Sequence, residues 1–220
     1  MIPPPACTGF ILVGGASSRM GREKAWLPVG RQALIEFVIR RVRPHVQRLL
    51  IVANARNACQ FERRLVEEVL VDLKPAHGPL MGIYTGLMHT ETPLNLFVPC
   101  DMPWIDGALI ARLRSACRER VRAVASLHPL EGMQPFPMMC HRDACRTIGA
   151  LLDRQERTVQ ALFHQPDTRL VRIDEPELWR SFTNVNTVAD YATLTDDPST
   201  RPPYGGLAQD HGERVKRVEP

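Results

Sequence analysis

The sequence LVGGASSRMGREK at residues 12–24 begins within the apolar run GFILV at residues 9–13 and continues beyond it. An apolar run that ends in paired glycines is typical of a buried strand entering a loop. Glycines let the backbone approach a ligand and offer its N–H groups to phosphate oxygens. Arg19 can hold a phosphate through two donors, and Lys24 adds a compact positive charge. The stretch therefore suits a triphosphate whose pyrophosphate leaves, and a turn with two surface cations is the alternative interpretation.

Two familiar glycine motifs do not fit this loop. A Walker loop requires Gly-Lys-Ser/Thr, whereas Gly21 is followed by Arg-Glu-Lys. The dinucleotide-binding fingerprint requires spaced glycines, whereas Gly14 and Gly15 are adjacent and the third glycine is too distant. The loop thus indicates phosphate binding outside both of these motifs.

Short apolar runs alternate with amphipathic segments along much of the chain. We expect strands at residues 9–13, 49–53, 69–71, 94–98 and 122–127. We expect helices at residues 33–47, 82–88, 107–118 and 188–194. Strands that alternate with helices favour right-handed βαβ units and a mostly parallel sheet. The predicted fold class is therefore α/β.

The composition is that of a globular enzyme, with 220 residues, 44% hydrophobic and 24% charged residues, and a net charge of +4. The basic side chains are scattered, which argues against a nucleic-acid-binding surface. No apolar stretch approaches the roughly 20 residues needed to span a bilayer, and the six cysteines do not resemble a disulfide framework. We expect one domain at residues 1–195, a loosely ordered tail at residues 196–220, and a cytoplasmic location.

Polar residues that directly follow the expected strands are candidates for one site. Asp101, in the sequence VPCDMP at residues 98–103, and Asn54 each follow a strand, as does the loop at Gly14. Ligands of parallel α/β sheets bind beyond the carboxyl ends of the strands, so these positions should converge. A carboxylate there suits Mg²⁺, which takes one or two carboxylates together with substrate phosphates and water. A helix cap or a solvated turn is the alternative for Asp101.

Two further segments combine glycines or amides with a helix start. The sequence DLKPAHGPLMGIYTGL at residues 72–87 fits a loop that offers N–H groups to a ligand, or a plain helix start. The sequence FTNVNT at residues 182–187 could present two amides to a phosphate, a metal or a pterin. Alternatively, Asn186 or Thr187 caps the helix that follows. Spacing alone does not choose between these interpretations.

Taken in order, these motifs resemble the signature of the molybdenum cofactor guanylyltransferases (MobA) and related nucleotidyltransferases. The similarity extends over residues 9–194. The matching positions are residues 12–24 with Leu27 and Gly30, Gly78-Pro79-Leu80 with Gly82 and Gly86-Leu87, Pro99-Cys100-Asp101-Met102-Pro103, Gln134-Pro135, and Asn184-Val185-Asn186-Thr187. Several motifs in the family's order are far more specific than any one of them.

The resemblance implies a Rossmann-like, three-layer α/β/α nucleotidyltransferase fold. It implies a Mg²⁺-dependent enzyme that transfers GMP from GTP to molybdopterin and releases pyrophosphate. The implied partners are GTP, molybdopterin and proteins of molybdenum insertion or molybdoenzyme maturation, with neither nucleic acid nor membrane.

The same resemblance implies roles for individual residues. The catalytic residues would be Lys24, Arg19 and Asp101, with Asp101 as the Mg²⁺ ligand. The nucleotide-binding residues would be Leu12, Gly14, Gly15, Lys24, Asn54, Asp72 and Asp101. The acceptor-binding residues would be Asn184 and Asn186.

Single positions bear on which nucleotide and acceptor are used. The Gly14-Gly15 pair resembles guanylyl enzymes, whereas cytidylyl relatives more often carry Ala-Gly, which favours GTP over CTP. The chain departs from the family pattern at Val13, at Glu23 and at residues 188–190, where Val-Ala-Asp replaces Pro-Glu-Asp. The last departure concerns acceptor recognition more than nucleotide binding. A cytidylyl or sugar-phosphate nucleotidyltransferase, or a nucleotide-binding module without turnover, stays open as an alternative.

Overall fold

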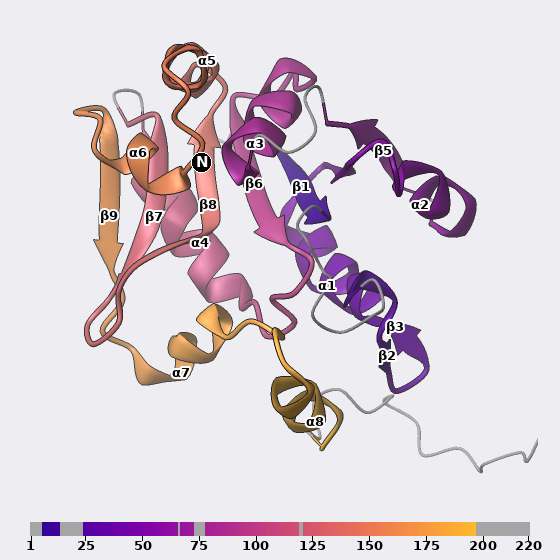
Figure 1. Ribbon diagram of the computed structural model, residues 1–220. Coiled ribbons are helices and arrows are strands. Elements are labelled where there is room, and N and C mark those ends of the chain that lie inside the picture. Colours follow the sequence, from indigo (N-terminus) through magenta and orange to yellow (C-terminus); the bar gives the residue numbers. More distant parts are fainter. Residues whose placement is uncertain (1–5, 14–23, 66, 73–77, 119–120, 197–220) are drawn as a thin grey trace, which may run out of the picture.

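The computed structural model describes residues 6–13, 24–65, 67–72, 78–118 and 121–196. Its main element is a seven-stranded sheet in the order β5-β4-β1-β6-β8-β7-β9 (Figure 1). These strands are β1 (Cys7–Val13), β4 (Arg48–Ala53), β5 (Glu68–Val71), β6 (Leu94–Pro99), β7 (Ala123–His128), β8 (Gly132–His141) and β9 (Thr168–Arg172). A separate antiparallel pair is formed by β2 (Pro28–Val29) and β3 (Gln32–Ala33). Gly14, Gly15, Arg19 and residues 197–220 of the expected tail lie outside the described residues.

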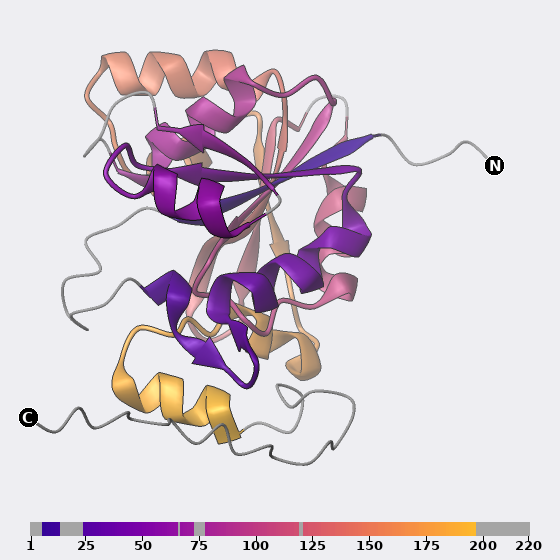
Figure 2. The same ribbon diagram turned by 90° about the vertical axis from the view of Figure 1, so that its right-hand side faces the viewer.

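Helices cover both faces of the sheet, as Figures 1 and 2 show. The α-helices are α1 (Leu34–Val42), α2 (Ala58–Arg64), α3 (Pro79–Met88), α4 (Gly107–Ala116), α5 (Ala144–Asp153), α6 (Val159–Phe163), α7 (Pro176–Trp179) and α8 (Val188–Asp196). The 3-10 helices are η2 (Lys24–Trp26), η3 (Arg43–His45) and η4 (Arg180–Phe182). One buried cluster packs α1, α2 and α4 on the sheet, and another packs α3, α5 and α6. The α/β/α layers confirm the expected fold class. Within the described part of the chain, no helix combines the length and apolar character that a bilayer span requires.

The central strands are buried on both faces. Ile11 of β1 and Ile51 of β4 belong to the first of these clusters, whereas the adjacent Phe10 and Leu50 belong to the second. Strands covered on both sides appear in sequence as continuous apolar runs, which is why these strands were predicted.

One strand breaks the parallel pattern. Strand β8 runs antiparallel to both β6 and β7, while β1, β4, β5 and β6 form parallel neighbours. The sequence analysis did not predict β8, which contains Pro135 and Pro137, because proline within an apolar run argues against a strand. The sheet is therefore mostly parallel, as expected, with β8 as an antiparallel insertion.

Prolines also shift two predicted helix boundaries. The helix expected at residues 33–47 ends at Val42 and continues as η3, because Pro44 lacks the N–H donor that an α-helix needs. The helix expected at residues 82–88 already begins at Pro79, since the fixed φ of proline suits a first helical position. Gly78 precedes it with a φ of 76°, a conformation that favours glycine.

Two glycines of α3 face the sheet with different clearance. A methyl group at Gly86 would lie 2.8 Å from Phe97 Cε1 and 3.1 Å from Phe10 Cδ1. These two rings are fully buried and stacked, with centroids 4.9 Å apart. A methyl group at Gly82 would meet only an ordinary contact, 3.6 Å from Leu12 Cδ2. Overpacking should therefore destabilise the protein when Gly86 is replaced by alanine, but not when Gly82 is.

We expect Gly86→Ala to lower the free energy of unfolding by about 1 kcal/mol. Overpacking costs about 1–3 kcal/mol, whereas the higher helix propensity of alanine over glycine stabilises α3 by about 1 kcal/mol. Gly82→Ala is the matched control, and it should leave the free energy of unfolding unchanged or raise it. Urea denaturation of both variants measures the difference. Equal effects at the two positions would contradict the packing described above.

Candidate active site

The carboxyl end of β1 lies in the middle of the sheet, between β4 and β6. Asn54 directly follows β4, and Asp101 follows β6 by two residues. The backbone N–H of Cys100 donates to the carbonyl of the half-buried Leu12 over 3.1 Å, which joins the Asp101 loop to β1. Asn54 and Asp101 therefore flank the end of β1, as the order of strands in the sequence led us to expect.

Lys24, Asp101 and Asn186 come from three distant segments and form a cluster at this edge of the sheet. The Lys24 Nζ donates to Asn186 Oδ1 over 2.7 Å, across 162 residues of sequence. The same ammonium lies 3.9 Å from Asp101 Oδ2, and the two side chains are only 17% and 22% exposed. The backbone N–H of Val185 donates to the carbonyl of Asp101 over 2.9 Å. A cation, a carboxylate and an amide thus share one small, partly buried site.

Neighbouring protein groups compensate the ionised form of Asp101 only in part. Burial raises the pKa of its carboxyl above the ordinary value, and the positive charge of Lys24 offsets part of this effect. A divalent cation would supply further positive charge, and Mg²⁺ accepts one carboxylate when substrate phosphates complete its coordination. Within the described ranges, no three His, Cys, Asp or Glu side chains converge on a metal position. Asp101 therefore fits a metal shared with a bound nucleotide better than a site closed by protein ligands.

Asn54 and Asp72 follow the neighbouring strands β4 and β5. Asn54 Oδ1 accepts from the N–H groups of Arg56 over 2.9 Å and Asn57 over 3.2 Å, in the turn before α2. Asp72 Oδ1 accepts from the Thr85 hydroxyl of α3 over 3.2 Å. These contacts extend the polar edge of the sheet from the cluster toward β5.

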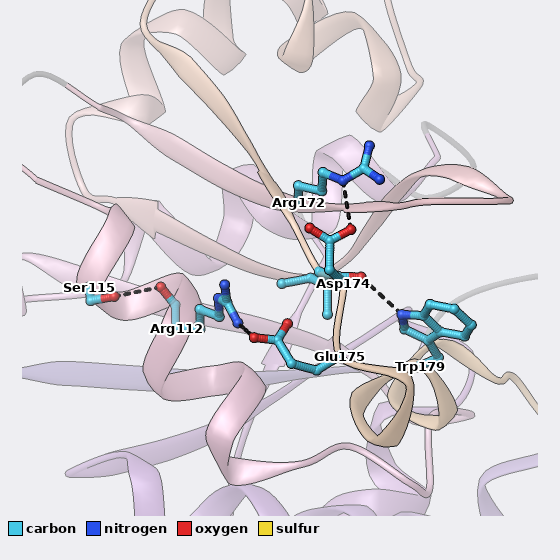
Figure 3. A network of polar contacts seen from close by, with 7 residues as sticks. Arg112, Ser115, Arg172, Asp174, Glu175 and Trp179 are labelled. Carbon is cyan, nitrogen blue, oxygen red and sulfur yellow. Dashed lines mark hydrogen bonds and ion pairs between the residues drawn. The ribbon is translucent and has the colours of Figure 1, made fainter.

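The segment at residues 173–187 leads to the site from β9, the edge strand on the side of the sheet away from β5. Figure 3 shows Glu175, directly before α7, paired with Arg112 of α4. The hydrogen bond from Arg112 lowers the pKa of Glu175 below its ordinary value, so this pair is ionised at neutral pH. The Trp179 indole N–H donates to the Ile173 carbonyl over 2.9 Å. The first contact joins the start of α7 to α4, and the second closes the turn between β9 and α7.

Asn184 directly precedes Val185 and is exposed. Before it, the buried Ser181 hydroxyl accepts from the backbone N–H of Asp106 over 3.1 Å. After it, Val185 contacts Asp101 as described above. Asn184 thus lies two residues before Asn186, which belongs to the cluster itself.

The sequence analysis assigned no role to Asp190. Its Oδ2 accepts from the backbone N–H groups of Asn186 and Thr187, both over 2.8 Å. The Asp190 N–H donates to Thr187 Oγ1 over 3.1 Å, so Thr187 caps α8, as one of the two interpretations above required. The Thr-x-x-Asp spacing of this reciprocal capping box is the signal that could have identified Asp190.

A mostly parallel α/β sheet with a lysine, a carboxylate and amides at the carboxyl ends of its central strands has these groups where such sheets bind their ligands. The chain belongs to the family described as the MobA-like NTP transferase domain, whose sequence model matches residues 9–171.

Individual proteins support this assignment. A molybdenum cofactor guanylyltransferase of Vibrio parahaemolyticus is 34% identical over 195 residues, covering 87% of this chain and 96% of the relative. The structure of molybdopterin-guanine dinucleotide biosynthesis protein A of Archaeoglobus fulgidus aligns with a TM-score of 0.75 at 20% identity, covering 86% of this chain and 97% of that chain. A Mycobacterium tuberculosis protein in complex with manganese aligns with a TM-score of 0.62 at 16% identity, covering 87% and 98% of the two chains. At these identities the two solved structures show a shared fold.

Proposed function

We propose that this chain is a Mg²⁺-dependent guanylyltransferase that transfers GMP from GTP to molybdopterin and releases pyrophosphate. The cluster of Lys24, Asp101 and Asn186 at the end of β1 is the observation that carries the proposal. It occurs in a chain of the MobA-like family, and the Vibrio parahaemolyticus relative bears the name of this activity.

The reaction joins a phosphate oxygen of molybdopterin to the α-phosphorus of GTP and breaks the bond from that phosphorus to the leaving pyrophosphate. The phosphate is itself a competent nucleophile, so positioning supplies much of the catalysis and no protein nucleophile is needed. Lys24 and Arg19 would neutralise the negative charge that develops on pyrophosphate. Asp101 would hold Mg²⁺, which when bound supplies charge neutralisation at the phosphates as a Lewis acid.

The other predicted residues would arrange the two substrates around this cluster. The proposed nucleotide contacts besides Lys24 and Asp101 are Leu12, Gly14, Gly15, Asn54 and Asp72. Asn184 and Asn186 would face the acceptor. The hydrogen bond between Asn186 and Lys24 would then link the acceptor side of the site to the triphosphate side.

Pyrophosphate release from GTP and from CTP, each with Mg²⁺ and purified molybdopterin, tests the proposal. We expect GTP to be preferred by about 10²-fold or more in kcat/KM, because a site that hydrogen-bonds one base leaves buried polar groups unpaired with another. Removal of Mg²⁺ with a chelator should stop release with either nucleotide. Preference for CTP would retain the transferase reaction and overturn the guanylyl assignment. Tight GTP binding without release would contradict molybdopterin as the acceptor.

A further inference from the structure

Asp190 stands at the start of α8, outside the cluster of Lys24, Asp101 and Asn186. Its carboxylate nevertheless binds the backbone that carries Asn186, through the two hydrogen bonds of 2.8 Å from Asn186 and Thr187. The return hydrogen bond of 3.1 Å to Thr187 Oγ1 closes the capping box. The backbone between Asn186 and Asp190 is therefore held from both ends of one helical turn.

The same loop is also fixed at Val185, the residue before Asn186. Val185 is fully buried, and its N–H donates to the Asp101 carbonyl over 2.9 Å. Its hydrophobic cluster consists of Leu27, Val29, Leu34, Phe37, Trp104, Val185 and Leu194. Asn186 is the next residue, so its backbone is positioned by Val185 on one side and by Asp190 on the other.

The side chain of Asn186 in turn determines where the Lys24 ammonium lies. Lysine carries a compact charge on a flexible stem, so the groups that receive its N–H donors set its position. Asn186 Oδ1 lies 2.7 Å from Lys24 Nζ, whereas Asp101 Oδ2 lies at 3.9 Å, beyond hydrogen-bond distance. Asn186 is thus the closer partner of the two, and its own placement depends on Asp190.

We infer that Asp190 is a positioning residue of this transferase. Its capping hydrogen bonds orient Asn186, and the amide oxygen of Asn186 then holds the Lys24 ammonium at the site of phosphate chemistry. The inference rests on the proposed function for the identity of the reaction, while the arrangement itself rests on the contacts described above. Asp190 touches no reacting group, so it acts through Asn186 and Lys24.

A double-mutant cycle on Asp190 and Asn186 tests this inference. We expect Asp190→Ala and Asn186→Ala each to reduce kcat for pyrophosphate release by about tenfold, with a smaller change in KM for GTP. The double variant should be no slower than Asn186→Ala alone, because both substitutions remove the same support of Lys24. Independent losses that multiply to about a hundredfold would overturn the positioning role.

Asp190→Asn is the conservative variant, since it keeps an oxygen acceptor for the two N–H groups and removes the charge. We expect its kcat to stay within about threefold of the wild type, because the residue at this position of a capping box can be an acid or an amide. A loss as large as that of Asp190→Ala would show that charge, and not hydrogen bonding, is what matters, and would overturn the inference.

Tyr191→Phe is a matched control on the same helix. It removes the hydrogen bond from the Tyr191 hydroxyl to the Pro28 carbonyl, which attaches α8 to β2, and leaves the capping box intact. We expect unchanged turnover for this variant. A loss equal to that of Asp190→Ala would attribute the effect to the docking of α8 and would contradict a specific role for Asp190.

Calorimetric titration with GTP and Mg²⁺, without any acceptor, separates this inference from the proposed function. If the wild type binds GTP but releases no pyrophosphate with molybdopterin, the proposed function fails and the cycle can still be measured on GTP affinity. Coupled losses of affinity in the Asp190 and Asn186 variants would then support positioning, and additive losses would overturn it.

Discussion

Lys24→Ala is expected to reduce kcat for pyrophosphate release by about 10²–10³-fold while leaving the fold intact, a size typical for the loss of one preorganised charge contact. The Lys24 side chain is only 17% exposed and lies 3.9 Å from Asp101, so its charge acts in a partly desolvated site where electrostatic effects are stronger than in water. The loss should fall mainly on kcat, because pyrophosphate gains negative charge as it leaves. Steady-state and single-turnover kinetics with GTP measure this.

Arg64→Ala provides the control for Lys24→Ala. The Arg64 guanidinium lies 4.8 Å from the ring centre of Trp26, which belongs to the same short helix η2 as Lys24. The variant removes an equal charge from this neighbourhood without altering the cluster, so turnover should stay within about twofold of the wild type. Equal losses in both variants would mean that only the overall positive potential matters. Near-normal turnover in Lys24→Ala would exclude Lys24 from the chemistry.

Asp101→Asn is expected to abolish Mg²⁺-dependent turnover, with a loss of about 10²-fold or more, without lowering thermal stability. Asparagine keeps the shape of the side chain but removes the negative charge that would hold the metal. Burial raises the pKa of the Asp101 carboxyl, so its ionised form is disfavoured in the folded protein relative to the unfolded chain. A neutral amide avoids this cost. Thermal melts and turnover assays of the same preparation separate the two effects.

The raised pKa of Asp101 also predicts a pH dependence. The folded protein binds the Asp101 proton more tightly than the unfolded chain does, so the protonated carboxyl favours folding. This contribution is fully present below the ordinary carboxyl pKa and is lost as the pH rises through the raised value. In the absence of metal, the wild type should therefore lose more stability than Asp101→Asn over this pH range. If the stability of the wild type and of Asp101→Asn changed equally with pH, this prediction would be wrong.

Asp106→Asn is the matched control for the same chemical change. The Asp106 carboxylate caps α4 by accepting from the Ala108 N–H over 2.7 Å, which also excludes Asp101 as the cap of that helix. Asparagine caps helices as well as aspartate does, so this variant should keep both stability and turnover. Mg²⁺-dependent turnover that survives in Asp101→Asn would rule out Asp101 as the metal ligand.

The elements that sequence patterns predicted are those with a strong local signal. The central strands β1, β4 and β6 are buried on both faces, so almost every residue in them is apolar and their runs are continuous. Strand β8 lacks such a run because its first half is only partly buried and the strand contains two prolines. Helices α2, α5, α6 and α7 were not predicted either. The end of α1 was placed too late because the effect of Pro44 was not taken into account.

Some features of the candidate site likewise follow from the sequence, whereas others depend on the tertiary structure. The sequence by itself determined that Asn54 and Asp101 flank one strand end, since parallel neighbours finish at the same edge of a sheet. It also contains the Thr187-x-x-Asp190 spacing of the capping box, because that interaction lies within one helical turn. Only the tertiary structure decided that Lys24 meets Asn186 across 162 residues, and that Asp101 is buried enough to raise its pKa. Both depend on how segments distant in sequence pack together, and no local pattern of residues encodes that packing.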